Sequence, residues 1–396
     1  MKILQVVPYF PPAYAFGGPV KVVYQISRGL VKRGHEVVVY TTDAKDFGSR
    51  MVISSDNIVD GVKVHRFRNV SLTLVKKFKL FITPQLVSLV KMEIKKFNVI
   101  HLHEYRTFQN IVVHHYARKY GLPYVLQAHG SFPRIGAWPG LKWLFDVFFG
   151  YRVLRDASKV IALSRVEAEQ YSGMGLPEEK IEVIPNGIDL SEYADLPPKG
   201  CFKKKFGIDE NDKIVLYLGR IHRIKGIDIL VKAFTDVIKK LDNVRLVVVG
   251  PDDGYLSEIE ALIRNLKIEN DVLITGPLYG RDKIEAYVDA DIYVLPSRYE
   301  IFGMTILEVA ACARPIVATD VSGAAPNIVL NGQTGFLVRP NSVLELTESL
   351  EYLLNNDDKS KKMGEQARER VVKLFSIQNT VAKIENLYSE ICAKAD

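Results

Sequence analysis

Cysteine is scarce in this sequence, and long apolar runs are missing from it. The 396 residues contain three cysteines, an odd number without the spacing of a zinc site: Cys201, Cys312 and Cys392. Their scarcity excludes a disulfide framework and favours a reducing, cytosolic setting. The most apolar window, Trp143 to Tyr151, is interrupted by Asp146 and is too short to span a membrane. The opening apolar run is too short for a secretion signal, so we expect a first strand there.

The composition is that of a soluble protein with more than one domain. With 47% hydrophobic and 25% charged residues, the chain is too long for one compact core and suits two domains. The first 200 residues hold 27 Lys and Arg against 17 Asp and Glu, whereas the remainder holds 26 against 29. This excess indicates either an acidic partner or anionic surface, or simply a solvated basic face. It forms no basic stripe of a known nucleic-acid motif, so we expect no nucleic-acid partner.

Short apolar runs alternate with helix-length segments through both halves of the chain. This alternation predicts parallel sheets built from right-handed βαβ units, and therefore an α/β protein with two Rossmann-like, doubly wound domains. The predicted strands are residues 3–7, 37–40, 62–67, 99–102, 124–128, 160–163, 181–184, 213–218, 244–249, 272–275, 292–295, 315–318 and 335–338. Ligands of such sheets bind beyond the carboxyl ends of the strands, so we expect the two domains to face each other across one cleft.

Turn-forming residues place the boundary between these domains. Residues 185–200 are dense in Pro, Gly and Asn and are the predicted linker and hinge between domains 1–190 and 199–375. The last segment, about 376–394, places Val381, Ile384, Leu387 and Ile391 at a helical period. We expect an amphipathic helix that packs back on the first domain.

Two glutamates flank a glycine turn in the second half. Glu300 lies in a loop between a predicted strand and a helix, and Glu308 lies about one turn into that helix. The backbone N–H groups of Phe302, Gly303, Met304 and Thr305 would be free to bind a phosphate, because a helix begins there and Gly303 permits close approach. Two readings of Glu308 stay open: a ligand for a sugar hydroxyl, or the last member of a capping box that begins at Thr305.

A second strand-to-helix loop carries two cations. Arg220 and Lys225 lie between Gly219 and Gly226, directly after the predicted strand 213–218. A planar guanidinium and an ammonium group that converge on one loop suit a diphosphate, particularly one that gains charge as a leaving group. The alternative is that both cations are solvated.

The first half offers a glycine loop and a strand-end histidine. Gly17 and Gly18 follow the first strand and open a helix, although they lack the full dinucleotide fingerprint. His129 follows the strand 124–128 and would point into the same cleft. His101 and His103 would lie on one face of a strand, with His114 and His115 nearby, but no carboxylate or cysteine completes a metal site, so we predict none.

Taken together, these motifs resemble the retaining glycosyltransferases of family four, which have the GT-B fold. The resemblance covers essentially the whole chain and rests on Arg220 with Lys225, Glu300 with Glu308, Gly17-Gly18, His129 and Pro185-Asn186-Gly187-Ile188-Asp189. It includes Gly-His-Glu-Val at 34–37 and Gly-x-Thr-Gly-Phe-Leu-Val at 332–338. Two departures, Ile301 and the segment 324–327 in place of a Gly-Gly-x-x-Glu pattern, leave the donor sugar open.

The resemblance implies a role for each residue. Arg220 and Lys225 would hold the donor diphosphate, Glu300 the hydroxyls of the transferred sugar, and Glu308 the ribose. His129 would lie at the sugar, Gly18 would admit the phosphates, and Asn186 would belong to the donor site. Transfer would proceed with retention by a front-face mechanism, without a metal or other cofactor, from a donor such as a UDP-, GDP- or ADP-sugar.

The sequence leaves two other functions and a membrane-binding role open. The same residues would serve a GT-B nucleotide-sugar epimerase, or a catalytically silent sugar- or nucleotide-binding protein. Basic, aromatic-rich segments at 76–96 and 132–155 would suit a glycan or lipid-linked acceptor at an anionic membrane, which would place the protein peripherally at the inner face. Alternatively, their aromatic residues belong to the core.

Overall fold

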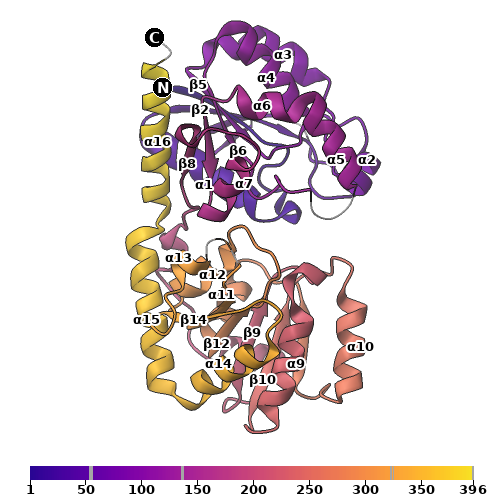
Figure 1. The fold of residues 1–396 in the computed structure, drawn as a ribbon, viewed down its shortest axis with the longest axis vertical. Helices are drawn as coiled ribbons and strands as arrows, with labels where there is room; N and C mark the ends of the chain where they lie inside the picture. Colours follow the sequence, from indigo (N-terminus) through magenta and orange to yellow (C-terminus); the bar gives the residue numbers. More distant parts are fainter. Residues whose placement is uncertain (53–56, 135–137, 322, 324, 395–396) are drawn as a thin grey trace. The chain divides into compact units, whose positions relative to one another are not determined.

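The computed structural model describes residues 1–52, 57–134, 138–321, 323 and 325–394. It divides into two compact units, each described by itself: unit 1 comprises Met1–Gly187 with Ile377–Asp396, and unit 2 comprises Ile188–Ser376 (Figure 1). The predicted linker, 185–200, contains the point at which unit 1 gives way to unit 2. Ala324, which begins one of the two departures from the family pattern, lies outside the described residues.

The described part of unit 1 contains one eight-stranded sheet in the order β3-β4-β2-β1-β5-β6-β7-β8. Neighbouring strands are parallel except β3 and β4, which are antiparallel. The strands are β1 Lys2–Val6, β2 Glu36–Thr42, β3 Ile58–Val59, β4 Val62–Phe67, β5 Val99–His103, β6 Tyr124–Gln127, β7 Lys159–Ala162 and β8 Ile181–Val183.

Helices cover both faces of this sheet. They are α1 Gly18–Lys32, α2 Leu72–Phe78, α3 Gln85–Glu93, α4 Phe108–Tyr120, α5 Pro139–Phe145, α6 Tyr151–Arg155, α7 Arg165–Ser172 and α16 Ile377–Ala393. Alternate strand residues such as Leu4 and Ile100 share a core with α3, α4, α6 and α7. Side chains of a strand alternate between faces, so Gln5 and His101 point the other way and bond the Tyr388 hydroxyl of α16.

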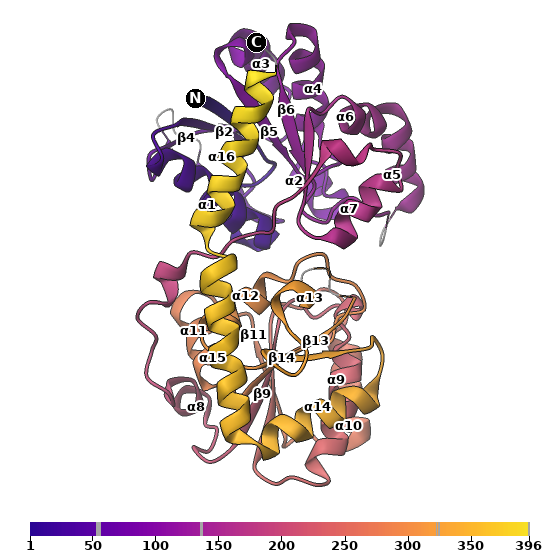
Figure 2. The same ribbon diagram turned by 60° about the vertical axis from the view of Figure 1, so that its left-hand side comes forward.

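The predicted C-terminal amphipathic helix is confirmed as α16, whose four predicted apolar residues are all buried. It lies along α1 in unit 1 (Figure 2). Their approach is close because α1 has no side chain at Gly29, where a Cβ would lie 2.6 Å from Val381 Cγ2. A Cβ at Gly187 would likewise lie 2.6 Å from the Cα of Ile377, so glycine is needed where α16 begins.

Unit 2 has a fully parallel six-stranded sheet in the order β11-β10-β9-β12-β13-β14. Its strands are β9 Lys213–Leu218, β10 Val244–Val249, β11 Val272–Gly276, β12 Ile292–Leu295, β13 Ile316–Thr319 and β14 Gly335–Val338. Its helices are α8 Cys201–Phe206, α9 Ile227–Ile238, α10 Leu256–Leu266, α11 Gly280–Asp289, α12 Met304–Ala311, α13 Ala325–Ile328, α14 Val343–Asn355 and α15 Asp357–Leu374. One core joins the sheet to α9, α10 and α14.

The strand predictions are confirmed in both units, with ends that differ by at most two residues. The two-residue strand β3 was not predicted. It pairs with β4 through Ile58 and Val59, which are too few to form an apolar run. The α/β class and the doubly wound arrangement therefore follow from the alternation of apolar runs and helical segments.

Candidate active site

Three strand-end loops of unit 2 meet backbone to backbone. β9 lies between β10 and β12 in the sheet, so the loops that follow these strands are neighbours. A Cβ at Gly226 would collide with the carbonyl oxygen of Pro296 after β12, and a Cβ at Gly250 after β10 would collide with the carbonyl oxygen of Gly219. Gly226 also has φ +68°, which favours glycine. The glycines therefore allow the side chains of these loops to converge.

Lys225 and Glu300 are brought together by this packing. Lys225 ends a short 3₁₀ turn, Arg223–Lys225, after β9, and its ammonium group donates to Oε2 of Glu300 in the loop after β12. The two side chains are only 13% and 18% exposed, so this ion pair is largely shielded from solvent. The pair places a cation and a carboxylate acceptor at one point beyond the carboxyl ends of β9 and β12.

Arg220 lies in the same loop but pairs elsewhere. Its guanidinium donates to Asp253, in the loop after β10, and its side chain is 52% exposed. Asp253 was not predicted, because a surface aspartate after a Gly-Pro-Asp turn has no distinguishing pattern in the sequence. Both predicted cations thus contact a carboxylate.

The loop after β12 leads into α12 as predicted, but the helix start differs in detail. Gly303, with φ +72°, is the N-cap, and the helix begins at Met304 with Phe302 buried before it. The capping-box reading of Thr305 is wrong: Thr305 lies inside the first turn, where its hydroxyl is bonded to Tyr293. Glycine supplies no side-chain cap. The first N–H groups of α12 can therefore donate to a ligand or to water.

Glu308 occupies a different environment from Glu300. It is 5% exposed, and its carboxylate accepts hydrogen bonds from Lys283 Nζ and the Tyr287 hydroxyl of α11, both at 2.8 Å. Lys283 and Tyr287 were not predicted, although their spacing of four residues places them on one side of a helix. A carboxylate has about four lone-pair positions, so these bonds leave capacity for a further donor.

Arg298 is another residue that the sequence did not single out. Its guanidinium forms two bonds to Asp228 at 2.8 and 2.7 Å and one to the Arg223 carbonyl at 2.7 Å. It therefore ties the loop after β12 to the turn that carries Lys225. No sequence signal separates it from other surface arginines.

In unit 1, the half-buried His129 lies just beyond β6 and belongs to a hydrogen-bonded chain that runs into the protein interior. Its Nε2 lies 2.8 Å from His103 Nδ1, and His103 Nε2 lies 2.6 Å from Gln5 Oε1. Gln5 Nε2 in turn lies 3.2 Å from the Tyr388 hydroxyl. Burial lowers the pKa of His129 to about 3 and holds the pKa of His103 well below its usual range, so both rings are neutral at pH 7.

The neutral chain also fixes where the protons lie. An amide oxygen only accepts, so with Gln5 oriented as it is, His103 Nε2 carries the proton and its Nδ1 accepts from His129 Nε2. His129 Nδ1 is then an acceptor, and it is buried without a hydrogen-bond partner among the described residues. Its backbone adopts φ +52°. The arrangement suits a fixed acceptor for a substrate hydroxyl, and the assignment of His129 to the sugar stays a prediction.

The other described histidines of unit 1 contact separate protein groups. His101 and His103 lie on one face of β5 as predicted, with ring centroids 4.0 Å apart. His101 bonds Tyr388, and His114 bonds Asp156 at 3.0 Å. In the part of the chain that the structure describes, no group of three or more His, Cys, Asp or Glu side chains is arranged to hold a metal ion.

The remaining predicted residues of unit 1 lie at two chain turns. Gly17, with φ +92°, is the N-cap of α1, and Gly18 is its first residue, so the helix opens without a side chain in the way. Asn186 is 4% exposed, and its Oδ1 has no partner within the described residues. Their contact with a donor stays a prediction.

Family models match almost the whole chain in two parts. Residues 16–192 match the model described as Glycosyltransferase Family 4, and residues 199–370 match the model described as Glycosyl transferases group 1. The chain belongs to the family four glycosyltransferases. The predicted family is confirmed, and with it a sugar-transferring enzyme.

One sequence relative and two solved structures match this glycosyltransferase over nearly the full length of both chains. It is 27% identical to an uncharacterized glycosyltransferase of Methanocaldococcus jannaschii, with 98% of each chain covered. The sucrose-phosphate synthase of Thermosynechococcus elongatus superposes with a TM-score of 0.81 at 23% identity, covering 99% of both chains. HepE of Anabaena, solved in complex with UDP-glucose, superposes with a TM-score of 0.76 at 21% identity, covering 98% and 100%. The predicted GT-B fold is thereby confirmed.

The described helices were compared with the length and apolarity of a membrane span. No helix in the described ranges combines the length and the apolarity that crossing a bilayer requires.

Proposed function

We propose that this glycosyltransferase moves a sugar from a nucleoside diphosphate donor to a hydroxyl of a glycan or glycolipid, with retention of the anomeric configuration. The observation that carries the proposal is the Lys225–Glu300 pair beyond the carboxyl ends of β9 and β12. A phosphate needs a cation, and a sugar hydroxyl needs an acceptor. The pair supplies both, beside the open first turn of α12.

Donor binding would separate the pair. In the structure Lys225 and Glu300 neutralise each other, and Arg220 is neutralised by Asp253. The diphosphate would take the two cations, and Glu300 would turn to a hydroxyl of the transferred sugar. Each charged group of the site would thus have a partner before and after the donor binds.

The chemical step needs no protein nucleophile. The bond from C1 of the sugar to the phosphate oxygen breaks, and the acceptor oxygen forms its bond to C1 on the same face. The acceptor proton passes to the departing phosphate oxygen. Lys225 and Arg220 stabilise the negative charge that grows on the diphosphate. We propose that this step proceeds without a metal ion or other cofactor.

The donor nucleotide is proposed by analogy alone. HepE was solved with UDP-glucose, which makes UDP-sugars the first donors to test, ahead of GDP- and ADP-sugars. We place the enzyme in the cytoplasm, where nucleotide sugars would reach it, and peripherally on the membrane for a lipid-held acceptor.

The test uses water as the acceptor, so that no natural acceptor is needed. A panel of UDP-, GDP- and ADP-sugars is ranked by the rise in Tm of the protein, because a ligand of the native state stabilises it. The selected donor is then incubated with the enzyme and EDTA, and NMR records the first-formed anomer of the released sugar. We expect the anomer of the donor. The inverted anomer would overturn retention, and activity that depends on added metal would overturn metal independence.

A matched pair of variants assigns the activity to the site. Glu300→Gln is expected to remove hydrolysis, whereas Glu351→Gln, which breaks an ion pair with Lys240 elsewhere in unit 2, is expected to keep it. Equal activity of the two variants would overturn the role of Glu300. Conversion of the donor into an epimeric nucleotide sugar would replace transfer by epimerisation.

A further inference from the structure

Large apolar side chains face solvent along one helical stretch of unit 1. They lie on the approach to α5, on α5 and on the π-helical turn Asp146–Gly150 that follows it. Six of them are 41 to 58% exposed: Trp138, Leu141, Trp143, Leu144, Val147 and Phe148. The reading that places the aromatic residues of this segment in the core is wrong for Trp138, Trp143 and Phe148. A contiguous exposed apolar surface of this kind marks a binding face.

The inner side of the same stretch is buried. The exposed apolar side chains therefore lie on its outer side, which is normally polar in a surface helix. Asp146 and Val153 are at most 1% exposed, and Gly150 is buried. A Cβ at Gly150 would lie 2.5 Å from the hydroxyl oxygen of Tyr105, which shows how closely the segment packs inward. The exposed apolar side chains are therefore not a failure of packing but the outer face of a well-anchored helix.

Negative charge is absent from this outer face. Asp146 is the one acidic residue between 138 and 155, and it is buried under bonds from Arg106 at 2.8 Å and Arg134 at 2.9 Å. Arg152 and Arg155, at the end of the stretch, are exposed. The face thus combines apolar and cationic groups without a carboxylate.

A second cationic segment joins the face. The Phe78 ring at the end of α2 lies 5.5 Å from the Trp138 ring. Lys76, Lys77 and Lys79 beside it are exposed, and residues 61–92 contain no Asp or Glu. We call this combined surface, residues 76–80 and 138–152, the aromatic face.

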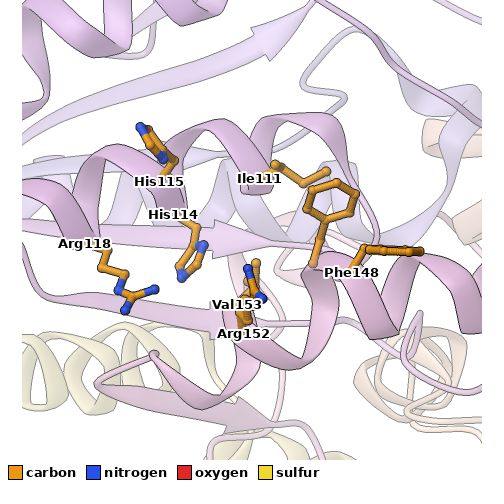
Figure 3. A pocket seen from close by; sticks show the side chains of 8 residues that line it. Ile111, His114, His115, Arg118, Phe148, Arg152 and Val153 are labelled. Atoms are coloured by element: carbon orange, nitrogen blue, oxygen red, sulfur yellow. The ribbon is translucent and has the colours of Figure 1, made fainter.

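A small pocket opens at the edge of the aromatic face. The pocket has a volume of about 220 Å³. Phe148, Arg152 on α6 and Arg118 on α4 are among its lining residues (Figure 3). Ile111 and Val153 also line it, together with His114 and His115, so the pocket combines apolar side chains with arginines and histidines.

We propose that the aromatic face docks unit 1 onto an anionic lipid bilayer. Indole rings and aliphatic side chains lodge at the boundary between headgroups and acyl chains, and lysines gain about 1 kcal/mol each near an anionic surface. A second copy of the chain fits less well, because a two-fold contact through this face would bring cationic rims against each other. The inference rests on the proposed function only for its purpose, which is to bring the enzyme to a lipid-held acceptor.

Co-sedimentation with vesicles tests the docking without any measurement of transfer. The protein is mixed with vesicles of phosphatidylcholine alone, or of equal parts phosphatidylcholine and phosphatidylglycerol. We expect binding to the anionic vesicles and far less to the neutral ones. Raising the salt from about 0.1 to about 1 M should weaken the binding, since the screening length falls from about 10 to about 3 Å.

Two variants separate the apolar from the electrostatic part. Leu144→Glu with Phe148→Glu should weaken binding by about tenfold or more, because two carboxylates enter the lipid-facing side. Lys76→Gln with Lys77→Gln should weaken it by about fivefold per lysine. The control is Leu344→Glu, which changes a 68% exposed leucine of unit 2 and should bind as the native protein does. Circular dichroism and Tm establish that each variant folds.

Three outcomes would overturn the proposal. The first is absence of binding by the native protein to anionic vesicles. The second is undiminished binding of the Leu144→Glu, Phe148→Glu variant. The third is a dimer in light scattering that this variant dissolves, which would make the face a contact between copies. The Tm rise with UDP-glucose is recorded in parallel, so that loss of donor binding is seen separately from loss of docking.

Discussion

The carboxyl edges of the two sheets carry opposite kinds of chemistry. In unit 2, the edge after β9 and β12 holds the Lys225–Glu300 ion pair, with Arg220 and Asp253 beside it. In unit 1, the edge at the ends of β5 and β6 holds the neutral histidines His103, which is buried, and His129, which is half-buried, in a hydrogen-bonded chain. Net charge runs the other way, since the first 200 residues hold the excess of Lys and Arg. The distribution of net charge along the chain therefore does not predict where the charged groups of the candidate site lie. The position of the strand-end loops does.

The largest effect is expected from removing the cation of unit 2. Lys225→Ala should lower kcat by about 10²- to 10³-fold, because the growing charge on the leaving diphosphate loses a preorganised partner. The rate of donor cleavage at saturating donor measures this effect. Lys240→Ala, which breaks the 2.8 Å ion pair with Glu351, is the control and should leave kcat unchanged. If Lys225→Ala stayed within threefold of the native rate, the charged edge would not be the site of the leaving group.

Substitution of the two glutamates of unit 2 should affect the free energy of unfolding to different extents. Glu308→Gln should lower the free energy of unfolding by roughly 2–3 kcal/mol, because Lys283 and Tyr287 lose a shared buried carboxylate. Glu300→Gln should change it by less than about 1 kcal/mol, because its partner Lys225 can turn to solvent. Urea denaturation of both variants measures the difference. Equal destabilisation would show that Glu300 is also a structural residue.

Much of this comparison could be predicted from the sequence, and the misses have physical causes. Strand-end position placed Lys225 and Glu300 at the same edge of one predicted sheet, because parallel strands end at one edge. The structure adds that β9 and β12 are neighbours, so their loops are adjacent. The partners of Glu308 were missed because Lys283 and Tyr287 come from another helix, and their approach depends on how α11 packs on α12. The capping box at Thr305 failed because the N-cap of α12 is Gly303, two residues before Thr305. Backbone conformation and packing between elements, rather than local pattern, decided these cases.

In unit 1, the buried chain should matter for stability. His103→Phe keeps the ring volume but leaves Gln5 Oε1 and His129 Nε2 without their shared partner. We expect a loss of about 2 kcal/mol in the free energy of unfolding, because buried polar groups without a hydrogen bond are costly. Thermal or urea unfolding measures it, with His115→Phe on the outer side of α4 as the control. A variant as stable as the native protein would mean that water or a changed rotamer satisfies both groups.

The smallest effect is a pH dependence that belongs to His129. Burial lowers its folded pKa to about 3, and its unfolded pKa is about 6.5, so between these values the unfolded chain binds the extra proton. Its contribution to stability is therefore lost as the pH falls below about 6.5. Between pH 7.5 and 5.5 the native protein should lose about 1 kcal/mol more than His129→Asn, a variant chosen because asparagine tolerates the positive φ at this position. Urea unfolding at both pH values gives the difference, in which the carboxylates and the other histidines cancel because both proteins contain them. Parallel losses in the two proteins would mean that His129 is protonated in the folded state, and the contrast between a charged unit 2 edge and a neutral unit 1 edge would fail.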